Sequence, residues 1–207
     1  IKMVITNYPE DKTEVFTLPN NPKDETAGSR DVPFTRELYI EKSDFAMVPP
    51  PKFQRLKPDG EVRLMGAYIV KCNEVITDEN GEVVELHCTA DLETGNGMPV
   101  DGRKVKGTIH WVSASHAIDA DCYLYDNLFT LENTGDVPEG KDYLDFLNPD
   151  SLKKLTGCKL EPSIAAVPTG TRMQFVRMGY FIKDTEDGRY NRIVTLKDSF
   201  AKTLQGK

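Results

Sequence analysis

The hydrophobic pattern along the chain has a short period almost everywhere. Runs of strand length, rich in β-branched and aromatic residues, occur at 14–18, 37–41, 83–89, 105–112, 120–124, 173–182 and 192–196. Short apolar runs of this kind are typical of β-strands rather than of amphipathic helices. The pattern therefore predicts an all-β protein, built as barrels or sandwiches.

Turn signals separate these runs. Pro58-Asp59-Gly60, Glu79-Asn80-Gly81 and Glu186-Asp187-Gly188 each lie between two apolar runs. Asn-Gly and Asp-Gly tolerate the positive φ that tight hairpin turns require. We therefore expect strands to be joined by short hairpins at these three places.

Two stretches depart from the strand pattern. Residues 142–156 have helix-like spacing that Pro149 interrupts and Gly157 ends, so we expect short helical turns in a connection there. Residues 47–51 contain three prolines, which cannot join a central strand and would stiffen a crossing between two units. We place a domain boundary near that segment.

Composition narrows the class of protein further. The 207 residues are 39% hydrophobic, with 15 Gly and 13 Pro, which suits a globular chain and excludes collagen-like and low-complexity classes. No apolar run is long enough for a membrane helix, and the first residues do not show the basic and then apolar pattern of a signal segment. Because the chain starts at Ile1, we expect an excised fragment. The four cysteines lack zinc-ligand spacing and predict reduced thiols in a cytoplasmic protein.

The net charge of −7 argues at first against nucleic acid, but its distribution does not. Residues 52–71 hold five basic and two acidic residues, residues 103–106 hold three basic residues and no acid, and residues 151–207 hold 11 basic and five acidic residues. Local potential, rather than the sum of charges, steers a polyanion. Binding of nucleic acid therefore stays open.

Enzyme-like motifs are weak. The segment 107–119 contains serines, histidines and an aspartate, but no G-x-S-x-G turn frames a nucleophile. The histidines His87, His110 and His116 lack the spacing of a metal site, and Gly95-Asn96-Gly97 lacks the residues of a phosphate loop. We therefore predict no catalytic residue and no metal site in this chain.

Basic and amide side chains alternate with aromatic residues in the basic stretches. Single-stranded RNA is bound in this way, with splayed bases stacked on flat side chains and base edges met by Arg, Gln or Asn. The basic and amide members are Arg55, Arg63, Lys71, Arg103, Lys104, Lys106, Arg172, Gln174 and Arg177, and the aromatic members are Phe53, Tyr68, Trp111, Phe175 and Tyr180.

Several longer segments carry a resemblance to a known family. They are residues 28–34, Arg55-Leu56, residues 61–64, residues 101–113, residues 124–129, Gln174-Phe175, Gly179-Tyr180-Phe181 and Asn191-Arg192. In this order they resemble the C-terminal anticodon-binding region of glutaminyl-tRNA synthetase, a class I aminoacyl-tRNA synthetase. The resemblance covers essentially the whole chain, and its block from Asp101 to Ser113 is highly specific.

The resemblance implies a fold of two β-barrels of the ribosomal-protein and anticodon-binding type, with short helical connections. We expect residues 1–45 plus 115–207 to form a first, proximal barrel. Residues 46–114 would form a second, distal barrel. The anticodon loop would lie between the barrels with its three bases unstacked.

The resemblance also implies roles for individual residues. Arg55 matches the family arginine at the third anticodon base, a guanine whose O6 and N7 suit a guanidinium fork. Arg63 matches an arginine near the first base. Gln174 matches a glutamine at the middle uracil, and Arg177 is expected at a phosphate or in the loop contact. Gln54 stands where well-known bacterial members have a lysine.

Three further expectations follow from the resemblance. Arg103, Lys104 and Lys106 are candidates for the tRNA backbone. Met65 stands where bacterial members have an arginine, and another family arginine at the middle base would lie upstream of Ile1. The HIGH-type and KMSKS-type motifs of the ATP site are absent from the 207 residues, so we expect no cofactor in this fragment.

The implied parent is a cytoplasmic ligase that joins glutamine to tRNA(Gln). ATP and Mg²⁺ would belong to an N-terminal catalytic domain of the same polypeptide, and we expect a monomer without membrane contact. Two alternatives remain open. One is the same region of an archaeal or eukaryotic type of glutamyl-tRNA synthetase, and the other is a stand-alone rRNA-binding or protein-interaction β module.

Overall fold

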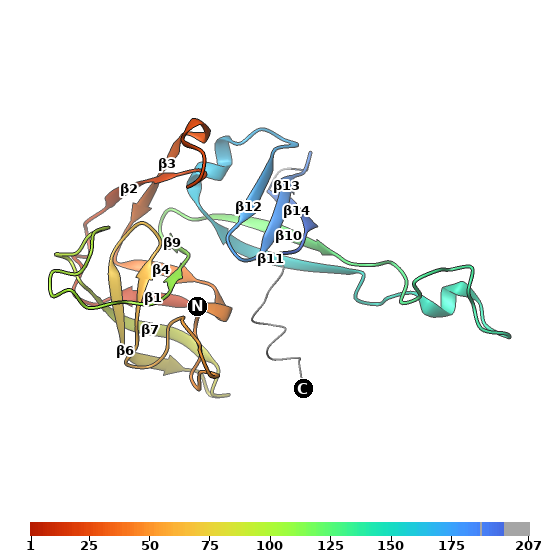
Figure 1. The fold of residues 1–207 in the computed structure, drawn as a ribbon, viewed down its shortest axis with the longest axis horizontal. Helices are drawn as coiled ribbons and strands as arrows, with labels where there is room; N and C mark the ends of the chain where they lie inside the picture. The colour runs from red at the N-terminus through yellow and green to blue at the C-terminus, as the bar shows by residue number, and fades with distance from the viewer. Residues whose placement is uncertain (187, 197–207) are drawn as a thin grey trace. The chain divides into compact units, whose positions relative to one another are not determined.

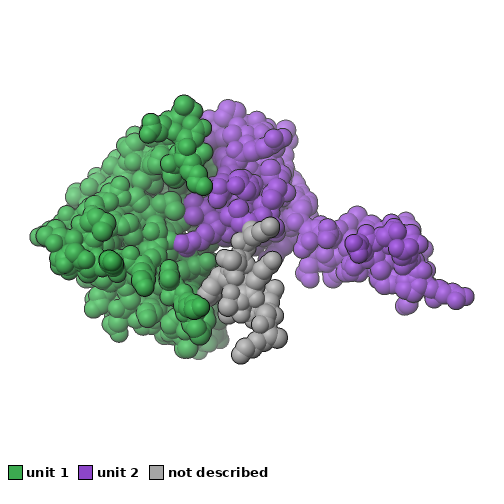
Figure 2. Space-filling model, in the orientation of Figure 1, with its two compact units in different colours: residues 1–118, 159–165 green, residues 119–158, 166–207 purple. Residues whose placement is uncertain are grey.

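A computed structural model describes residues 1–186 and 188–196 of the chain. The chain forms two compact units, which are coloured separately in Figure 2. Unit 1 comprises residues 1–118 and 159–165, and unit 2 comprises residues 119–158 and the part of the chain from residue 166 onward.

Unit 1 is built around a seven-stranded sheet with the order β8-β5-β6-β7-β1-β4-β9. Its strands are β1 (Lys2–Ile5), β4 (Glu37–Ile40), β5 (Glu61–Leu64), β6 (Ile69–Thr77), β7 (Val83–Ala90), β8 (Thr108–Ile109) and β9 (Trp111–Ser113). The two edge strands, β8 and β9, are separated only by His110, so the sheet must curl on itself. It forms a nearly closed barrel (Figure 1).

A separate hairpin, β2 (Glu14–Pro19) and β3 (Ser29–Phe34), packs aromatic side chains onto the barrel core. The Phe34 ring lies 5.0 to 5.2 Å, between centroids, from the rings of Tyr8, Tyr68 and Trp111. Edge-to-face contacts of this kind add stability beyond the apolar area that they bury. A cluster of aromatic rings therefore forms part of the barrel core.

Unit 2 contains a five-stranded sheet with the order β11-β10-β14-β13-β12. Its strands are β10 (Ile118–Tyr125), β11 (Leu152–Leu160), β12 (Arg172–Phe175), β13 (Gly179–Lys183) and β14 (Arg189–Val194). β10 and β11 continue into a long arm that carries the short 3-10 helix η3 (Tyr143–Phe146) (Figure 1). The other 3-10 turns are η1 (Glu25–Ala27), η2 (Lys42–Asp44) and η4 (Pro162–Ala166).

The all-β class and the short helical connections are confirmed, whereas several predicted boundaries are corrected. Residues 152–156 are not helical. They belong to β11, which lies beside β10 at the edge of the sheet. The run 173–182 divides into β12 and β13, with a turn at Arg177 (φ 62°). The run 105–112 is interrupted at His110, and the run 192–196 is a strand only to Val194. Asp187 of the third turn signal lies outside the described residues.

The predicted division into residues 1–45 plus 115–207 and residues 46–114 differs from the two units of the structure. β1 pairs with β7, from Lys2↔Glu85 to Ile5↔Cys88, so the N-terminal segment and the segment 46–114 share one sheet and one core. Residues 47–51 mark no boundary either, since unit 1 is continuous from residue 1 to residue 118.

Candidate nucleic-acid interface

Three distant segments of unit 1 meet at Gly107. The backbone N–H of Arg63 donates to the Gly107 carbonyl at 3.1 Å. A Cβ atom on Gly107 would lie only 1.8 Å from the carbonyl oxygen of Gln54, and the φ of Gly107 is +92°. Glycine is required there because the two backbones approach so closely. These contacts bring together two groups of predicted RNA-binding residues, those in the segment 54–63 and those in the segment 103–106.

Arg55 is held in place by the turn that precedes it. Its Nη1 donates to the Ser43 carbonyl at 2.9 Å, and its Nε lies 3.5 Å from Oδ1 of Asp44, whose side chain is fully buried. The Arg55 side chain as a whole is 19% exposed. A side chain that is already fixed before binding loses less conformational entropy when a ligand binds. Arg55 is therefore a charged group preorganised at the surface.

Arg63 is anchored more fully. Its Nη1 donates to the carbonyls of Ala67 and Gly95 at 3.0 and 3.2 Å, and its Nη2 donates to the carbonyl of Gly97. Since a guanidinium has about five N–H donors, about two are left for a ligand. Arg63 can therefore join the loop after β7 to a bound base.

The three cations of residues 103–106 fall into two kinds. Lys104 and Lys106 are exposed, as expected of side chains that approach a polyanion. Arg103 instead pairs with Asp91, Asp101 and Glu61 within unit 1. The structure therefore supports a backbone contact for the two lysines better than for Arg103.

In unit 2 the β12–β13 hairpin presents the remaining predicted residues. Gln174 lies directly opposite Tyr180 in the register of the two strands, and both side chains are exposed, Tyr180 at 40%. Phe175 lies on the other face and stacks on Phe181, with 4.3 Å between ring centroids. Arg177 is exposed at the hairpin turn. An amide beside an exposed ring can meet the edge of one base while the ring stacks on another.

The cluster that resembles a hydrolase is internal to unit 1. Ser113 is 1% exposed, and its Oγ lies 2.7 Å from Thr35 Oγ1 and 3.0 Å from His116 Nδ1. Nucleophilic attack requires a hydroxyl that a substrate can reach. These hydrogen bonds therefore join β9 to its neighbours and support a structural role.

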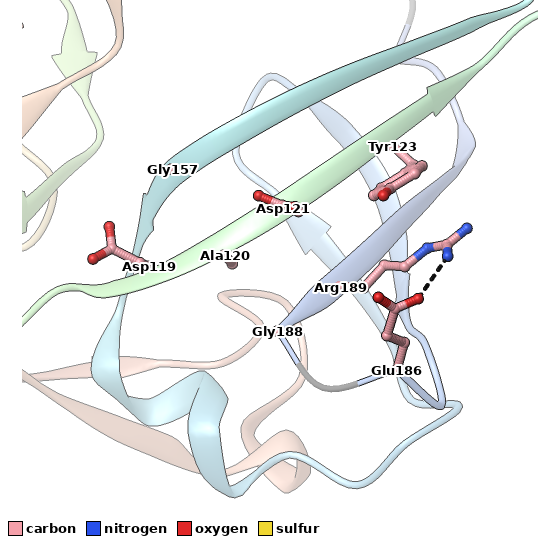
Figure 3. Close-up of a pocket in the computed structure, with 8 residues that line it drawn as sticks. All are labelled: Asp119, Ala120, Asp121, Tyr123, Gly157, Glu186, Gly188 and Arg189. Carbon is pink, nitrogen blue, oxygen red and sulfur yellow. Dashed lines mark hydrogen bonds and ion pairs between the residues drawn. The ribbon is translucent and has the colours of Figure 1, made fainter.

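One hollow of about 220 Å³ occurs in unit 2 and is shown in Figure 3. Its lining carries three carboxylates and one guanidinium, which is itself paired with Glu186 at 2.9 Å. This balance of charge disfavours a phosphate. The lining residues are Asp119, Ala120, Asp121, Tyr123, Gly157, Glu186, Gly188 and Arg189.

The described residues include neither a membrane-spanning helix nor a cluster of metal ligands. None of their helices has the length and apolar character to cross a membrane. Nor does that part of the chain hold three or more His, Cys, Asp or Glu side chains grouped so as to bind a metal ion.

Comparison with protein families decides the relationship. The model described as "tRNA synthetases class I (E and Q), anti-codon binding domain" matches residues 1–91, and a second model with that description matches residues 108–184. The chain belongs to this family. The two matched ranges of the anticodon-binding domain lie on either side of most of the loop 91–107 that anchors Arg63.

Individual relatives agree with the family. The chain is 50% identical over 207 residues to glutamine–tRNA ligase of Xanthomonas campestris pv. campestris (strain 8004), covering 98% of this chain and 36% of the relative. It is 52% identical over 207 residues to the ligase of Clostridium perfringens, covering 97% and 37%, and 50% identical over 206 residues to that of Rhodopirellula baltica, covering 98% and 34%. The chain thus spans roughly a third of the length of these curated relatives.

Two features of this anticodon-binding domain were missed by reasoning from the sequence. The Gly95 and Gly97 carbonyls that hold Arg63 are backbone groups. Every residue has such a group, so residue type does not predict which carbonyls bind Arg63. The pairing of Asp44 with Arg55 joins residues 11 positions apart through a 3-10 turn that the apolar pattern does not predict. The only signal in the sequence for an ion pair such as Asp44–Arg55 is the presence of acidic and basic residues in the same part of the chain.

Proposed function

We propose that this chain is the anticodon-reading region of a glutamine–tRNA ligase and that it binds the anticodon loop of tRNA(Gln). The observation that carries the proposal is that the two family matches cover the candidate base-reading residues, Arg55 and Arg63 in the first range and Gln174 in the second. The relatives compared are all glutamine–tRNA ligases, which favours this reading over the glutamyl type. A stand-alone rRNA-binding or protein-interaction module would not be expected to resemble these ligases along its whole length.

Binding would proceed in two stages. Exposed cations such as Lys104 and Lys106 would attract the phosphates, and this part of the affinity would fall with salt. Arg55, Arg63 and Gln174 would then meet the base edges. A wrong base would leave their polar groups desolvated and without partners, which costs more than the correct hydrogen bond contributes.

The remainder of the parent would supply the chemistry. ATP and Mg²⁺ would be bound by a catalytic domain outside these 207 residues, as would glutamine. The described side chains of this chain would bind and orient the anticodon loop only. We place the parent in the cytoplasm as a monomer, and both remain predictions.

The contrast between Arg55 and Lys104 tests the proposal. Arg55→Lys keeps a positive charge beside buried Asp44 but removes the guanidinium fork, so folding should persist. We expect preference for guanine at the third anticodon position to fall by ~1–3 kcal/mol, the worth of one bidentate base contact. Lys104→Ala should instead weaken cognate and mismatched loops alike and reduce the salt dependence by about one unit.

The measurement is a titration of this chain and both variants with anticodon stem-loops that differ only at the third base, at two salt concentrations. Equal losses on both loops for Arg55→Lys would mean that Arg55 holds the RNA without reading it. Absence of any binding by the unaltered chain would refute the proposed function itself.

A further inference from the structure

Arg103 is enclosed by carboxylates. Its Nη2 lies 2.7 Å from Asp91, its Nη1 lies 2.9 Å from Asp101, and its Nε lies 3.2 Å from Glu61. One guanidinium among three carboxylates leaves a net charge of −2. A phosphate approaching Arg103 would therefore meet a negative local field. The geometry assigns Arg103 a role inside the protein.

The three carboxylates belong to different parts of the chain. Asp91 directly follows the end of β7, Glu61 begins β5, and Asp101 lies in the loop 91–107 itself. Arg103 thus ties the second half of this loop to the start of the loop and to β5. Multiple charge-assisted hydrogen bonds from one planar guanidinium fix direction as well as distance.

The middle of the same loop is bound by Arg63. Glu61 and Arg63 are two residues apart on β5, so their side chains leave the same face of the strand. Arg63 binds the carbonyls of Gly95 and Gly97, and Glu61 binds Arg103. The loop is therefore attached to one face of β5 at two points.

Apolar packing adds only one buried side chain to these attachments, because Pro99 is the one apolar residue of 91–104 that is buried. Leu92, Met98 and Val100 are 43%, 79% and 81% exposed, and the glycines that contact Arg63 have no side chain to bury. A loop with few buried apolar groups takes its position from its polar contacts. The positions of the Gly95 and Gly97 carbonyls therefore depend on the cluster around Arg103. These carbonyls are two of the three that hold the Arg63 guanidinium, the third being that of Ala67.

We propose that Arg103 is a positioning residue: by holding the loop 91–107 it orients the Arg63 guanidinium for the first anticodon base. The inference rests on the proposed function, in which Arg63 meets that base. Arg103 itself contacts no RNA. Specificity at the first anticodon base therefore depends on Arg103 and its three carboxylates, which act on the base only through Arg63.

The test compares Arg63→Gln, Arg103→Gln and the double variant, with Lys106→Gln as a control that removes a cation from the same segment. Each is titrated with stem-loops that differ only at the first base and with a second set that differs only at the third. We expect Arg63→Gln to abolish preference at the first base. Arg103→Gln should reduce that preference about tenfold, within the range for one base contact, and leave the third position unchanged.

The double variant should discriminate no worse than Arg63→Gln alone, because both substitutions remove the same contact. Lys106→Gln should weaken all loops equally. Loss of affinity for every loop in Arg103→Gln, with first-base preference intact, would overturn the inference and restore a backbone contact. If Arg63→Gln itself leaves first-base preference intact, the role of Arg63 in the proposed function fails instead.

Asp101→Asn provides a second approach that keeps the arginine, should Arg103→Gln not fold. Asp101 is 59% exposed in its side chain, so the substitution should be tolerated. If Arg103 positions the loop, Asp101→Asn lowers preference at the first base. If Arg103 contacts phosphates, freeing it from one carboxylate strengthens binding of all loops without changing preference, and the inference is wrong.

Discussion

Glu161 offers a sharp electrostatic test of how unit 1 is held together. Its carboxylate accepts hydrogen bonds from His110 Nε2 at 2.9 Å and from Nε and Nη2 of Arg30. The side chain is only 13% exposed. Burial alone would raise the pKa of Glu161, but the hydrogen bonds from His110 and Arg30 outweigh burial and lower the pKa to about 2.

The expected contribution to stability follows from this shift. The pKa falls from an ordinary 4.5 to about 2, and one pKa unit is worth ~1.4 kcal/mol, so the ionised carboxylate stabilises the folded state by about 3 kcal/mol. Because the folded pKa lies below the unfolded pKa, the full stabilisation is present above pH 4.5. It is lost as the pH falls from 4.5 toward 2.

The perturbation is Glu161→Gln, and the assay is urea unfolding of the chain and the variant at a series of pH values. At pH 7 the variant should be less stable by about 3 kcal/mol, and the difference should shrink steadily below pH 4.5. Glu41→Gln is the matched control. Burial raises the pKa of Glu41, so this variant should be more stable than the unaltered chain at pH 7.

Two results would refute the reasoning. A loss that stays constant from pH 7 to pH 3 would mean that Glu161 acts through packing rather than through its charge. A loss well below about 1 kcal/mol at pH 7 would mean that removing this carboxylate from water costs nearly as much as its partners return.

Three further outcomes are expected. The isolated chain should show no glutamine-dependent exchange between ATP and pyrophosphate, because its sequence lacks the ATP-site motifs; exchange above background would contradict this. Ser113→Ala and His116→Ala should leave any esterase activity of the purified chain unchanged, since Ser113 is 1% exposed; loss of such activity in either variant would restore the hydrolase reading. Gly107→Ala should lower the melting temperature more than Gly81→Ala. Both glycines have positive φ, at a cost of ~1–2 kcal/mol for alanine, but only Gly107 would also bring a Cβ within 1.8 Å of the Gln54 carbonyl.

Several local elements could be read from the sequence because local chemistry decides them. The runs at 14–18, 37–41, 83–89 and 120–124 lie within β2, β4 with the residue that follows it, β7 and β10, since alternating burial on a pleated strand leaves a period of two in the residues. The turn that contains Asn80 and Gly81 joins β6 to β7 for a similar reason, because few residues other than glycine accept the φ of 80° at Gly81.

Other features depended on partners far away in the chain. The residues 152–156 have apolar spacing that fits a helix, and the neighbouring strand β10 makes them a strand. The pairing of β1 with β7 joins residues about 80 positions apart, so the predicted domain boundaries had no local signal to correct them. Parallel pairing of this kind is decided by burial in a shared core.

The same division holds at the candidate interface. The sequence alone determined which residue types are available, and its resemblance to a family singled out Gln54, Arg55, Arg63 and Gln174. Only the tertiary structure decided which cations face solvent and which form ion pairs within the protein. Arg103 and Lys104 are neighbours with the same charge, yet one meets three carboxylates and the other is exposed. A charge acquires its role from the groups that folding places around it, and for Arg103 those groups come from β5 and from two places in the loop 91–107.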